Sequence, residues 1–277
     1  MKTEKRYLVP GDYMADPAVH VFDGKLYIYP SHDWESGIAE NDNGDHFNMK
    51  DYHVYSMDDV MNGEITDHGV VLSTGDIPWA GRQLWDCDVA FKDGKYYMYF
   101  PLKDQNDIFR IGVAVSDKPY GPFVPEANPM KGSYSIDPAV WNDGDGNYYM
   151  YFGGLWGGQL QRYRNNKALE SAILPEGEEE ALPSRVVRLS DDMMEFAEEP
   201  LPFIHTSISD SAFWSPSVIR RSSTNSLEFA SITTFVVRIV ESTPLICTVS
   251  SVKTEFSPIS IFVTGFRIRC PVPFPSP

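Results

Sequence analysis

One phrase occurs three times in the first half of this chain, and it constrains the fold more than any other feature. Each copy contains an acidic residue, a short apolar strand, a turn built on Gly and an aromatic strand; the copies cover residues 16–29, 88–99 and 137–151. Asp-Gly between two alternating strands is a strong signal of a β-hairpin. Recurrence of such a unit predicts a repeat architecture made of β-sheets.

The segments that follow each copy supply further strands, which we expect over residues 53–58, 108–117 and 185–189. Units of about four strands are typical of propeller blades. The polar stretch 31–50 is too long for a simple turn, and its length predicts a functional loop at the rim of the first unit.

Charge and aromatic content narrow the class of partner. The 277 residues carry a net charge of −16, which argues against binding to nucleic acid or to an anionic membrane surface. Aromatic residues make up 13% of the chain, which suits both β-structure and stacking on sugars. A glycan substrate is therefore compatible with this composition. The composition does not indicate an oligomeric state.

The sequence contains few signals that indicate a cellular location, disulfide bonds or metal binding by cysteine. The cysteines Cys87, Cys247 and Cys270 are scattered and form neither a disulfide framework nor a zinc motif. The first residues contain no apolar stretch of the secretory type, and no window is long enough for a transmembrane span. We therefore expect a cytoplasmic location.

The composition changes abruptly near residue 205. Of the 39 acidic residues only three follow residue 210, the last tyrosine is Tyr163, and the aromatic hairpin phrase never returns. We therefore divide the chain into a propeller part, 1–205, and an aberrant Ser/Thr-rich segment, 206–277, in which we see no hairpin turn signal. The segment is either a divergent final module or the product of a shifted reading frame; its conflict with the patterned first part favours the second.

Two copies of the repeat begin with the same four residues, Asp-Pro-Ala-Val, at Asp16 and Asp137. In a propeller the innermost strands line the central channel, so carboxylates at their starts converge. Converging carboxylates suit glycoside hydrolysis, in which one ionised group activates water and one protonated group releases the leaving group. Asp-Pro is also an ordinary strand-entry signal, but two near-identical copies favour the catalytic interpretation.

Five segments, taken in order, carry a family resemblance: Met14-Ala-Asp-Pro-Ala-Val19, Leu84-Trp-Asp-Cys-Asp-Val89, the Asp-Gly-Lys-Tyr-Tyr-type hairpins, Ser116-Asp-Lys-Pro-Tyr-Gly-Pro-Phe123 and Ser135-Ile-Asp-Pro-Ala-Val-Trp141. Through them residues 7–200 resemble glycoside hydrolase family 43. The resemblance implies an all-β, five-bladed β-propeller, here incomplete with about three recognisable blades. It also implies an α-L-arabinofuranosidase or β-D-xylosidase that acts on arabinose- or xylose-containing glycans.

The resemblance implies an inverting, two-carboxylate mechanism. Asp16 takes the place of the general base, and Asp137 that of the residue that tunes and orients the general acid. The family's acid is a Glu in a later Phe-Glu-x-x-Trp-type segment, which this sequence lacks. Glu195, Glu198 and Glu199 lie in the expected region, but their context matches a solvated acidic run better. We therefore expect the chain to be severely impaired as a catalyst.

Four further residues are candidates for sugar contact: Trp85, Asp86, His32 and Trp156. Trp85 and Asp86 share the inner position of Asp16 in the second repeat, although a packed core role for Trp85 is a close alternative. His32 follows the first aromatic strand, where a rim-loop role competes with sugar contact. Trp156 lies in a Gly-rich segment that permits close approach of a ligand, or that is simply a flexible loop.

We expect no required cofactor and assign no metal ligand, although the resemblance admits a structural calcium ion in the propeller channel. Two rival functions remain. One is a non-catalytic sugar-binding propeller, which would bind arabinose or xylose oligomers without turnover. The other is a different five-bladed family of fructan-acting enzymes, whose Asn-Asp-Pro-Asn-Gly-type first motif differs from Ala15-Asp-Pro-Ala18.

Overall fold

The computed structural model describes residues 7–60, 63–169 and 171–203, together with the backbone of 260–263 and 266–269. The chain divides into two compact units, Met1–Phe203 and Ile204–Pro277. In the second unit β14 (Ser260–Val263) pairs antiparallel with β15 (Phe266–Arg269).

This pair lies within the segment 206–277. The remainder of the proposed frame-shifted segment lies outside the described residues.

The first unit begins with a four-stranded antiparallel sheet in sequence order, here called sheet A. Its strands are β1 (Met14–Phe22), β2 (Lys25–His32), β3 (Asp51–Met57) and β4 (Thr66–Ser73). Asp23 and Gly24 connect β1 to β2 with φ of 51° and 76°, the left-handed conformation that a two-residue hairpin turn requires. The strand expected from residue 53 is thus confirmed as part of β3.

Sheet B repeats this pattern. It consists of β6 (Asp88–Lys92), β7 (Lys95–Asp104), β8 (Phe109–Ser116) and β9 (Val124–Pro125), and short β5 (Ala80–Arg82) pairs with the far end of β7. Its hairpin turn, Asp93-Gly94, has φ of 50° and 78°. A 3-10 turn, η1 (Thr74–Asp76), precedes β5.

Sheet C is the third and shortest copy. Its strands are β10 (Ala139–Asn142), β11 (Tyr148–Phe152), β12 (Arg185–Arg188) and β13 (Leu201–Pro202). Two 3-10 turns, η2 (Trp156–Gly158) and η3 (Leu160–Arg162), lie between β11 and β12. The strand expected over 185–189 is confirmed by β12.

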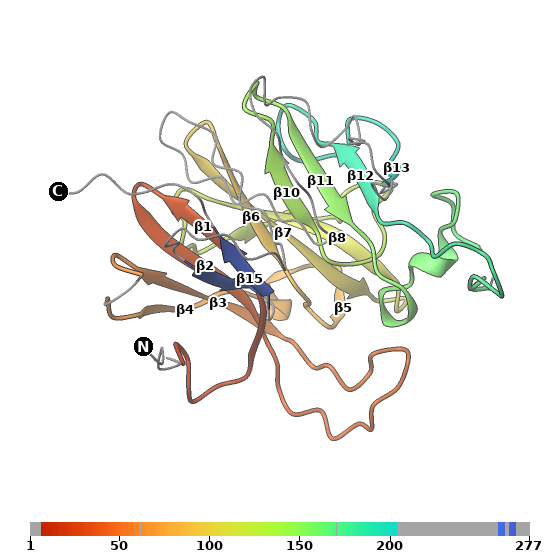
Figure 1. Ribbon diagram of the computed structural model, residues 1–277, viewed down its shortest axis with the longest axis horizontal. Helices are drawn as coiled ribbons and strands as arrows, with labels where there is room; N and C mark the ends of the chain where they lie inside the picture. Colours follow the sequence, from red (N-terminus) through yellow and green to blue (C-terminus); the bar gives the residue numbers. More distant parts are fainter. Residues whose placement is uncertain (1–6, 61–62, 170, 204–259, 264–265, 270–277) are drawn as a thin grey trace. The chain divides into compact units, whose positions relative to one another are not determined.

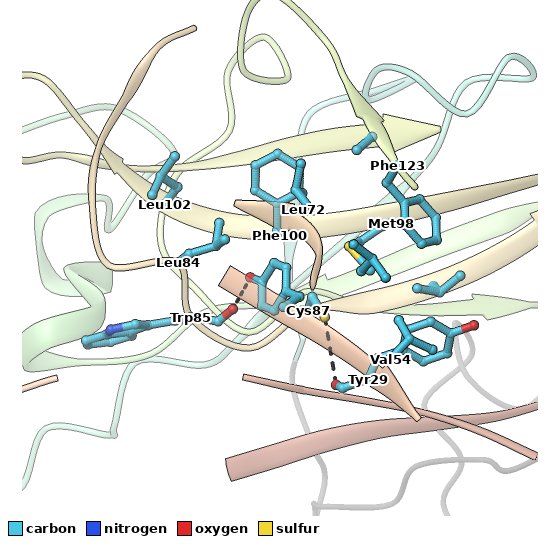
Figure 2. Close-up of a cluster of buried hydrophobic side chains, with 14 of the residues drawn as sticks. Tyr29, Val54, Leu72, Leu84, Trp85, Cys87, Met98, Phe100, Leu102 and Phe123 are labelled. Atoms are coloured by element: carbon cyan, nitrogen blue, oxygen red, sulfur yellow. Dashed lines mark hydrogen bonds between the residues drawn. The ribbon is translucent and has the colours of Figure 1, made fainter. Parts of the chain in front are cut away.

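The first strands of the three sheets lie side by side. β6 contacts both β1 and β10, and Figure 1 shows these strands close together near the middle of the first unit. One cluster of buried side chains joins sheets A and B, and another joins sheets B and C. In the first cluster Leu72, Met98 and Phe100 are nearly inaccessible to solvent (Figure 2).

Face-to-face packing of four-stranded antiparallel sheets, with their first strands together, is the arrangement of neighbouring propeller blades. The all-β, propeller-type prediction is confirmed to this extent, with three such sheets among the described residues. Within the same residues, no helix is both long and apolar enough to cross a membrane.

Candidate active site

The strand register brings three aspartates to one equivalent position. Ala18, Asp88 and Ala139 pair with the matching tyrosines of their hairpins, Tyr29, Tyr99 and Tyr151. The residue two places earlier in each copy is Asp16, Asp86 and Asp137. Because β1, β6 and β10 are neighbours, these three carboxylates converge at the starts of adjacent inner strands.

The register agrees with the expected placement of Asp86 at the inner position of Asp16. Asp88, the first residue of the repeated phrase in the second copy, pairs like an alanine of the other two copies, so Asp86 is the counterpart of Asp16 and Asp137.

Asp16 and Asp137 share an unusual backbone conformation. Their φ angles are 43° and 58°, in the left-handed region that non-Gly residues rarely adopt, although Asp tolerates it better than most. Each also precedes a proline, which disfavours helical backbone at the preceding residue. Strain of this kind, repeated at equivalent positions, is typical of functional sites.

Electrostatic coupling within this trio is strong. Desolvation by the surrounding protein raises the pKa of Asp137 to about 7, and the negative charge of Asp16 contributes in the same direction. Desolvation also raises the pKa of Asp86 well above its usual range, with further contributions from the charges of Asp137 and Asp16. Asp16 and Asp137 keep solvent contact, so both are accessible to a ligand.

The side chains of Asp16 and Ser31 act on Asp86 in opposite directions, since Asp16 raises its pKa and Ser31 lowers it. Neighbouring carboxyl groups that disfavour one another's ionisation are typical of sites that use general acid–base chemistry.

Asp88 has a different task, which the sequence analysis missed. Its Oδ1 lies 2.5 Å from His20 Nε2 on β1, and its Oδ2 accepts a hydrogen bond of 2.6 Å from the Val140 backbone N–H on β10. One side chain therefore ties the inner strands of all three sheets together. The sequence did not indicate which of the three inner strands lies in the middle.

Trp85 is 8% exposed, which agrees with the core alternative. Its indole ring packs 4.7 Å from Phe109 and 5.4 Å from Phe47, measured between ring centroids. Its backbone carbonyl accepts a hydrogen bond from Tyr52, drawn in Figure 2. Direct stacking of Trp85 on a sugar stays a prediction.

Gly residues from two loops fit closely against this tryptophan. A Cβ added to Gly44 would lie 2.8 Å from the indole, and one added to Gly157 would lie 3.1 Å from it. Gly154 borders the aspartates, since a Cβ there would lie 3.8 Å from Asp137 Oδ2. The Gly-rich segment 153–158 thus connects the Trp85 packing to the Asp137 carboxylate, and close approach is what its glycines provide.

Trp156 lies at the surface of this segment, 59% exposed and with φ of 50°. An exposed indole beside the loop that borders Asp137 suits a sugar-stacking role, which stays a prediction.

His32 has partners of its own. Its Nδ1 lies 2.6 Å from Asp51 Oδ1 and its Nε2 lies 3.1 Å from Asp12 Oδ1. Successive residues of a strand face opposite sides of a sheet, so His32 points away from the side on which Ser31 meets Asp86. Sugar contact by His32 stays a prediction. In the structure its two ring nitrogens lie beside the carboxylates of Asp51 and Asp12.

The acidic run 195–199 provides no fourth partner for the trio among the described residues. Glu195, Glu198 and Glu199 are all exposed. Glu195 lies in a tight turn closed by Ser190, whose hydroxyl accepts a hydrogen bond from the Glu195 N–H. This agrees with a solvated acidic run.

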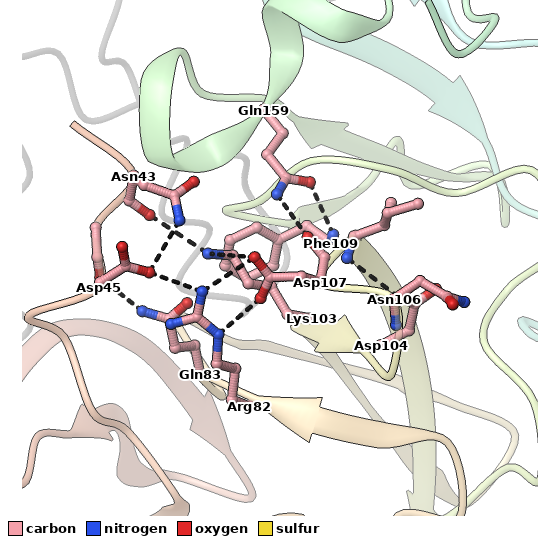
Figure 3. A network of polar contacts seen from close by, with 12 residues as sticks. Asn43, Asp45, Arg82, Gln83, Lys103, Asp104, Asn106, Asp107, Phe109 and Gln159 are labelled. Carbon is pink, nitrogen blue, oxygen red and sulfur yellow. Dashed lines mark hydrogen bonds and ion pairs between the residues drawn. The ribbon is translucent and has the colours of Figure 1, made fainter. Parts of the chain in front are cut away.

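The loop of residues 33–50 is held against sheet B by a network of polar contacts (Figure 3). Arg82 contacts Asp45 and Asp107 at 2.7 Å each, and Gln83 Nε2 donates to the Gly44 carbonyl at 2.6 Å. The fully buried Lys103 donates to the backbone of the same loop, and desolvation lowers its pKa. The network fixes the loop beside Trp85.

Carboxylates gathered at the inner strand starts of a propeller-type fold are the equipment of a glycoside hydrolase. A sequence model of glycosyl hydrolases family 43 matches residues 8–176. The chain belongs to this family, as its motifs led us to expect.

Several relatives agree. A xylosidase/arabinosidase of Bacteroides ovatus is 95% identical over 200 residues, covering 72% of this chain and 62% of the relative. A β-xylosidase of Xylanibacter ruminicola is 58% identical over 196 residues, covering 70% and 61%. A solved β-xylosidase structure matches with 80% identity and a TM-score of 0.70, covering 72% of this chain and 62% of that one. The chain thus spans about three fifths of the length of these relatives.

Another solved relative bears on the expected calcium. It is a β-xylosidase/α-arabinofuranosidase from a compost microbial metagenome, 59% identical with a TM-score of 0.66 over 70% of this chain and 60% of its own, complexed with xylotriose in a calcium-free form. Calcium prefers six to eight oxygen ligands. Among the described residues, the group of close metal-ligating atoms is His32, Asp51 and His53, which offers two nitrogens. This group therefore does not match the oxygen ligand set that calcium prefers.

Proposed function

We propose that this chain carries the base side of an inverting glycosidase site for arabinose- or xylose-containing glycans, within a five-bladed propeller of which it supplies three blades. The observation that carries the proposal is the convergence of Asp16, Asp86 and Asp137 at equivalent strand starts, with raised pKa values at Asp86 and Asp137. The names of the relatives support the sugar class.

Each aspartate has a role in this scheme. Asp16 accepts a proton from the attacking water. Asp137 takes the place of the residue that orients the general acid. Asp86 lies beside both, and desolvation together with their negative charges raises its pKa. None of the described glutamates joins the trio, and the sequence lacks the Phe-Glu-x-x-Trp-type motif of the general acid, so we expect slow turnover.

The second candidate is a binding propeller that recognises the same sugars without turnover. The absence of a described glutamate beside the trio favours this candidate as well. The two candidates share a pocket and differ in the rate of bond cleavage alone.

A titration tests the shared pocket. Xylotriose, arabinotriose and maltotriose are added separately to the 277-residue chain, and binding is followed by calorimetry. We expect the two pentose oligomers to bind and the glucose oligomer to bind at least about tenfold more weakly, because a pocket shaped for pentoses has no room for the additional hydroxymethyl group.

The matched variants are Asp16→Ala, which removes a hydrogen-bonding carboxylate from the trio, and Asp117→Asn, which changes an exposed aspartate paired with Lys95. Asp16→Ala should weaken pentose binding about tenfold or more, and Asp117→Asn should leave it unchanged. If both variants bound the pentose oligomers equally well, the trio would not be part of the sugar site.

A further inference from the structure

A second group of ligating side chains lies in sheet A, separate from the aspartate trio. His32 ends β2 and pairs in register with Asp51, the first residue of β3. His53 follows two residues later on β3, and its ring centroid lies 5.2 Å from that of His32. One ligand atom from each of the three lies within 4.8 Å of the others.

The two histidines are oriented in the same way. The outer nitrogen of each lies 3.1 Å from a carboxylate: His32 Nε2 from Asp12, and His53 Nδ1 from Asp67. The inner nitrogens face a single atom, Asp51 Oδ1, at 2.6 Å from His32 Nδ1 and 3.9 Å from His53 Nε2. A carboxylate behind each histidine is the arrangement that fixes the ring and raises its basicity at metal centres.

Asp51 is anchored as well. Its second oxygen, Oδ2, accepts a hydrogen bond of 3.1 Å from Trp34 Nε1, which leaves Oδ1 directed at the two histidines. The side chains of His32, Asp51 and His53 are 6%, 11% and 17% exposed. The group is thus mostly enclosed, and His53 is its most exposed member.

We propose that His32, Asp51 and His53 bind a divalent cation of the zinc type. Two imidazole nitrogens and one carboxylate oxygen, with water in the fourth position, form a common ligand set for zinc. Ligands about 2.1 Å from a tetrahedral zinc stand about 3.4 Å apart. To reach that spacing, the 2.6 Å contact opens and the 3.9 Å contact closes by less than about 1 Å each. The two ring nitrogens, which lie within 4.8 Å of each other, approach by at most about 1.4 Å.

The position of this site gives it a structural consequence. His32 and Asp51 stand at the two ends of the loop 33–50, so a cation between them closes the neck of that loop. The carboxylates behind the histidines come from the segment before β1 and from β4, so the site joins that segment to β2, β3 and β4. The same loop packs Gly44 against Trp85, so the cation stiffens one wall of the region beside the aspartate trio.

The experiment measures binding of Zn²⁺, and of Co²⁺ as a spectroscopic probe, to the full chain after treatment with a chelator. One ion per chain is expected, and Co²⁺ should show the intense visible absorption of a four-coordinate site. Ca²⁺ in the same concentration range should not compete. Because Zn²⁺ binds the folded state, the thermal unfolding midpoint should rise with its concentration.

Three variants separate this site from adventitious binding. His53→Gln should weaken Zn²⁺ binding about 100-fold or more, and Asp67→Asn, behind His53, about 10–100-fold. His46→Gln, which changes a histidine outside the group, should bind as the parent chain does. Should His53→Gln fail to fold, the Asp67→Asn and Co²⁺ measurements still decide. Unaltered affinity in Asp67→Asn, or Co²⁺ with only the weak absorption of the hydrated ion, would overturn the proposal.

Discussion

The 277-residue chain is expected to hydrolyse nitrophenyl β-D-xyloside and α-L-arabinofuranoside about 10²–10⁴-fold more slowly than its Bacteroides ovatus relative, in kcat. The reason is the leaving group, which departs as an alkoxide or phenoxide unless a general acid protonates it. The described part of the chain brings three aspartates together but no glutamate to donate that proton. The comparison requires only steady-state kinetics of both proteins on the same substrates.

The leaving group itself provides the control. A glycosyl fluoride or dinitrophenyl glycoside departs with little need for a proton, so the rate deficit should shrink markedly on these substrates. A deficit that is equal on all leaving groups would place the defect in binding or folding. Turnover at the relative's rate on the poorer leaving groups would contradict the assignment of a missing acid.

Asp88→Ala is expected to lower the free energy of unfolding of the first unit by about 2–4 kcal/mol. The substitution removes the partner of His20 on β1 and of the Val140 N–H on β10 in a single step. Asp88 is nearly inaccessible to water, so solvent cannot replace these bonds. Urea unfolding, followed by tryptophan fluorescence, measures the loss.

Two matched variants sharpen this measurement. Asp88→Asn keeps one acceptor oxygen, so its free energy of unfolding should fall by roughly half as much as that of Asp88→Ala. Asp86→Asn, only two residues away, relieves repulsion among carboxylates and should be neutral or stabilising. A loss of less than about 1 kcal/mol in Asp88→Ala would mean that the three inner strands are held by packing alone.

Much of the fold could be predicted from local patterns. Asp23-Gly24 and Asp93-Gly94 require left-handed backbone, which marks both hairpins, and tyrosine-rich strands follow them. From each hairpin onward, the order of the strands within a sheet then follows their order along the chain, because each hairpin is followed by the next strand of the same sheet.

The site could be predicted only where a residue with catalytic chemistry recurs at the same position of the repeat. Asp16 and Asp137 share both a motif and a position, and Asp86 follows from the register. The bridging role of Asp88 depends on which strand lies in the middle, and the burial of Trp85 depends on Gly44 and Gly157 from distant loops. The His32, Asp51 and His53 group escaped notice because its members are spread over two strands that become neighbours only through the long loop between them.

The most direct test of the trio is the titration of its carboxyl groups by NMR, with Asp side chains labelled at the carboxyl carbon. Asp137 should titrate near pH 7, and its pKa should fall in Asp16→Asn because a neighbouring negative charge is lost. It should remain above its ordinary value of 3.8, since desolvation, the larger cause, persists. An Asp137 that titrates at its ordinary value, with no response to Asp16→Asn, would show that the three aspartates do not form a coupled site.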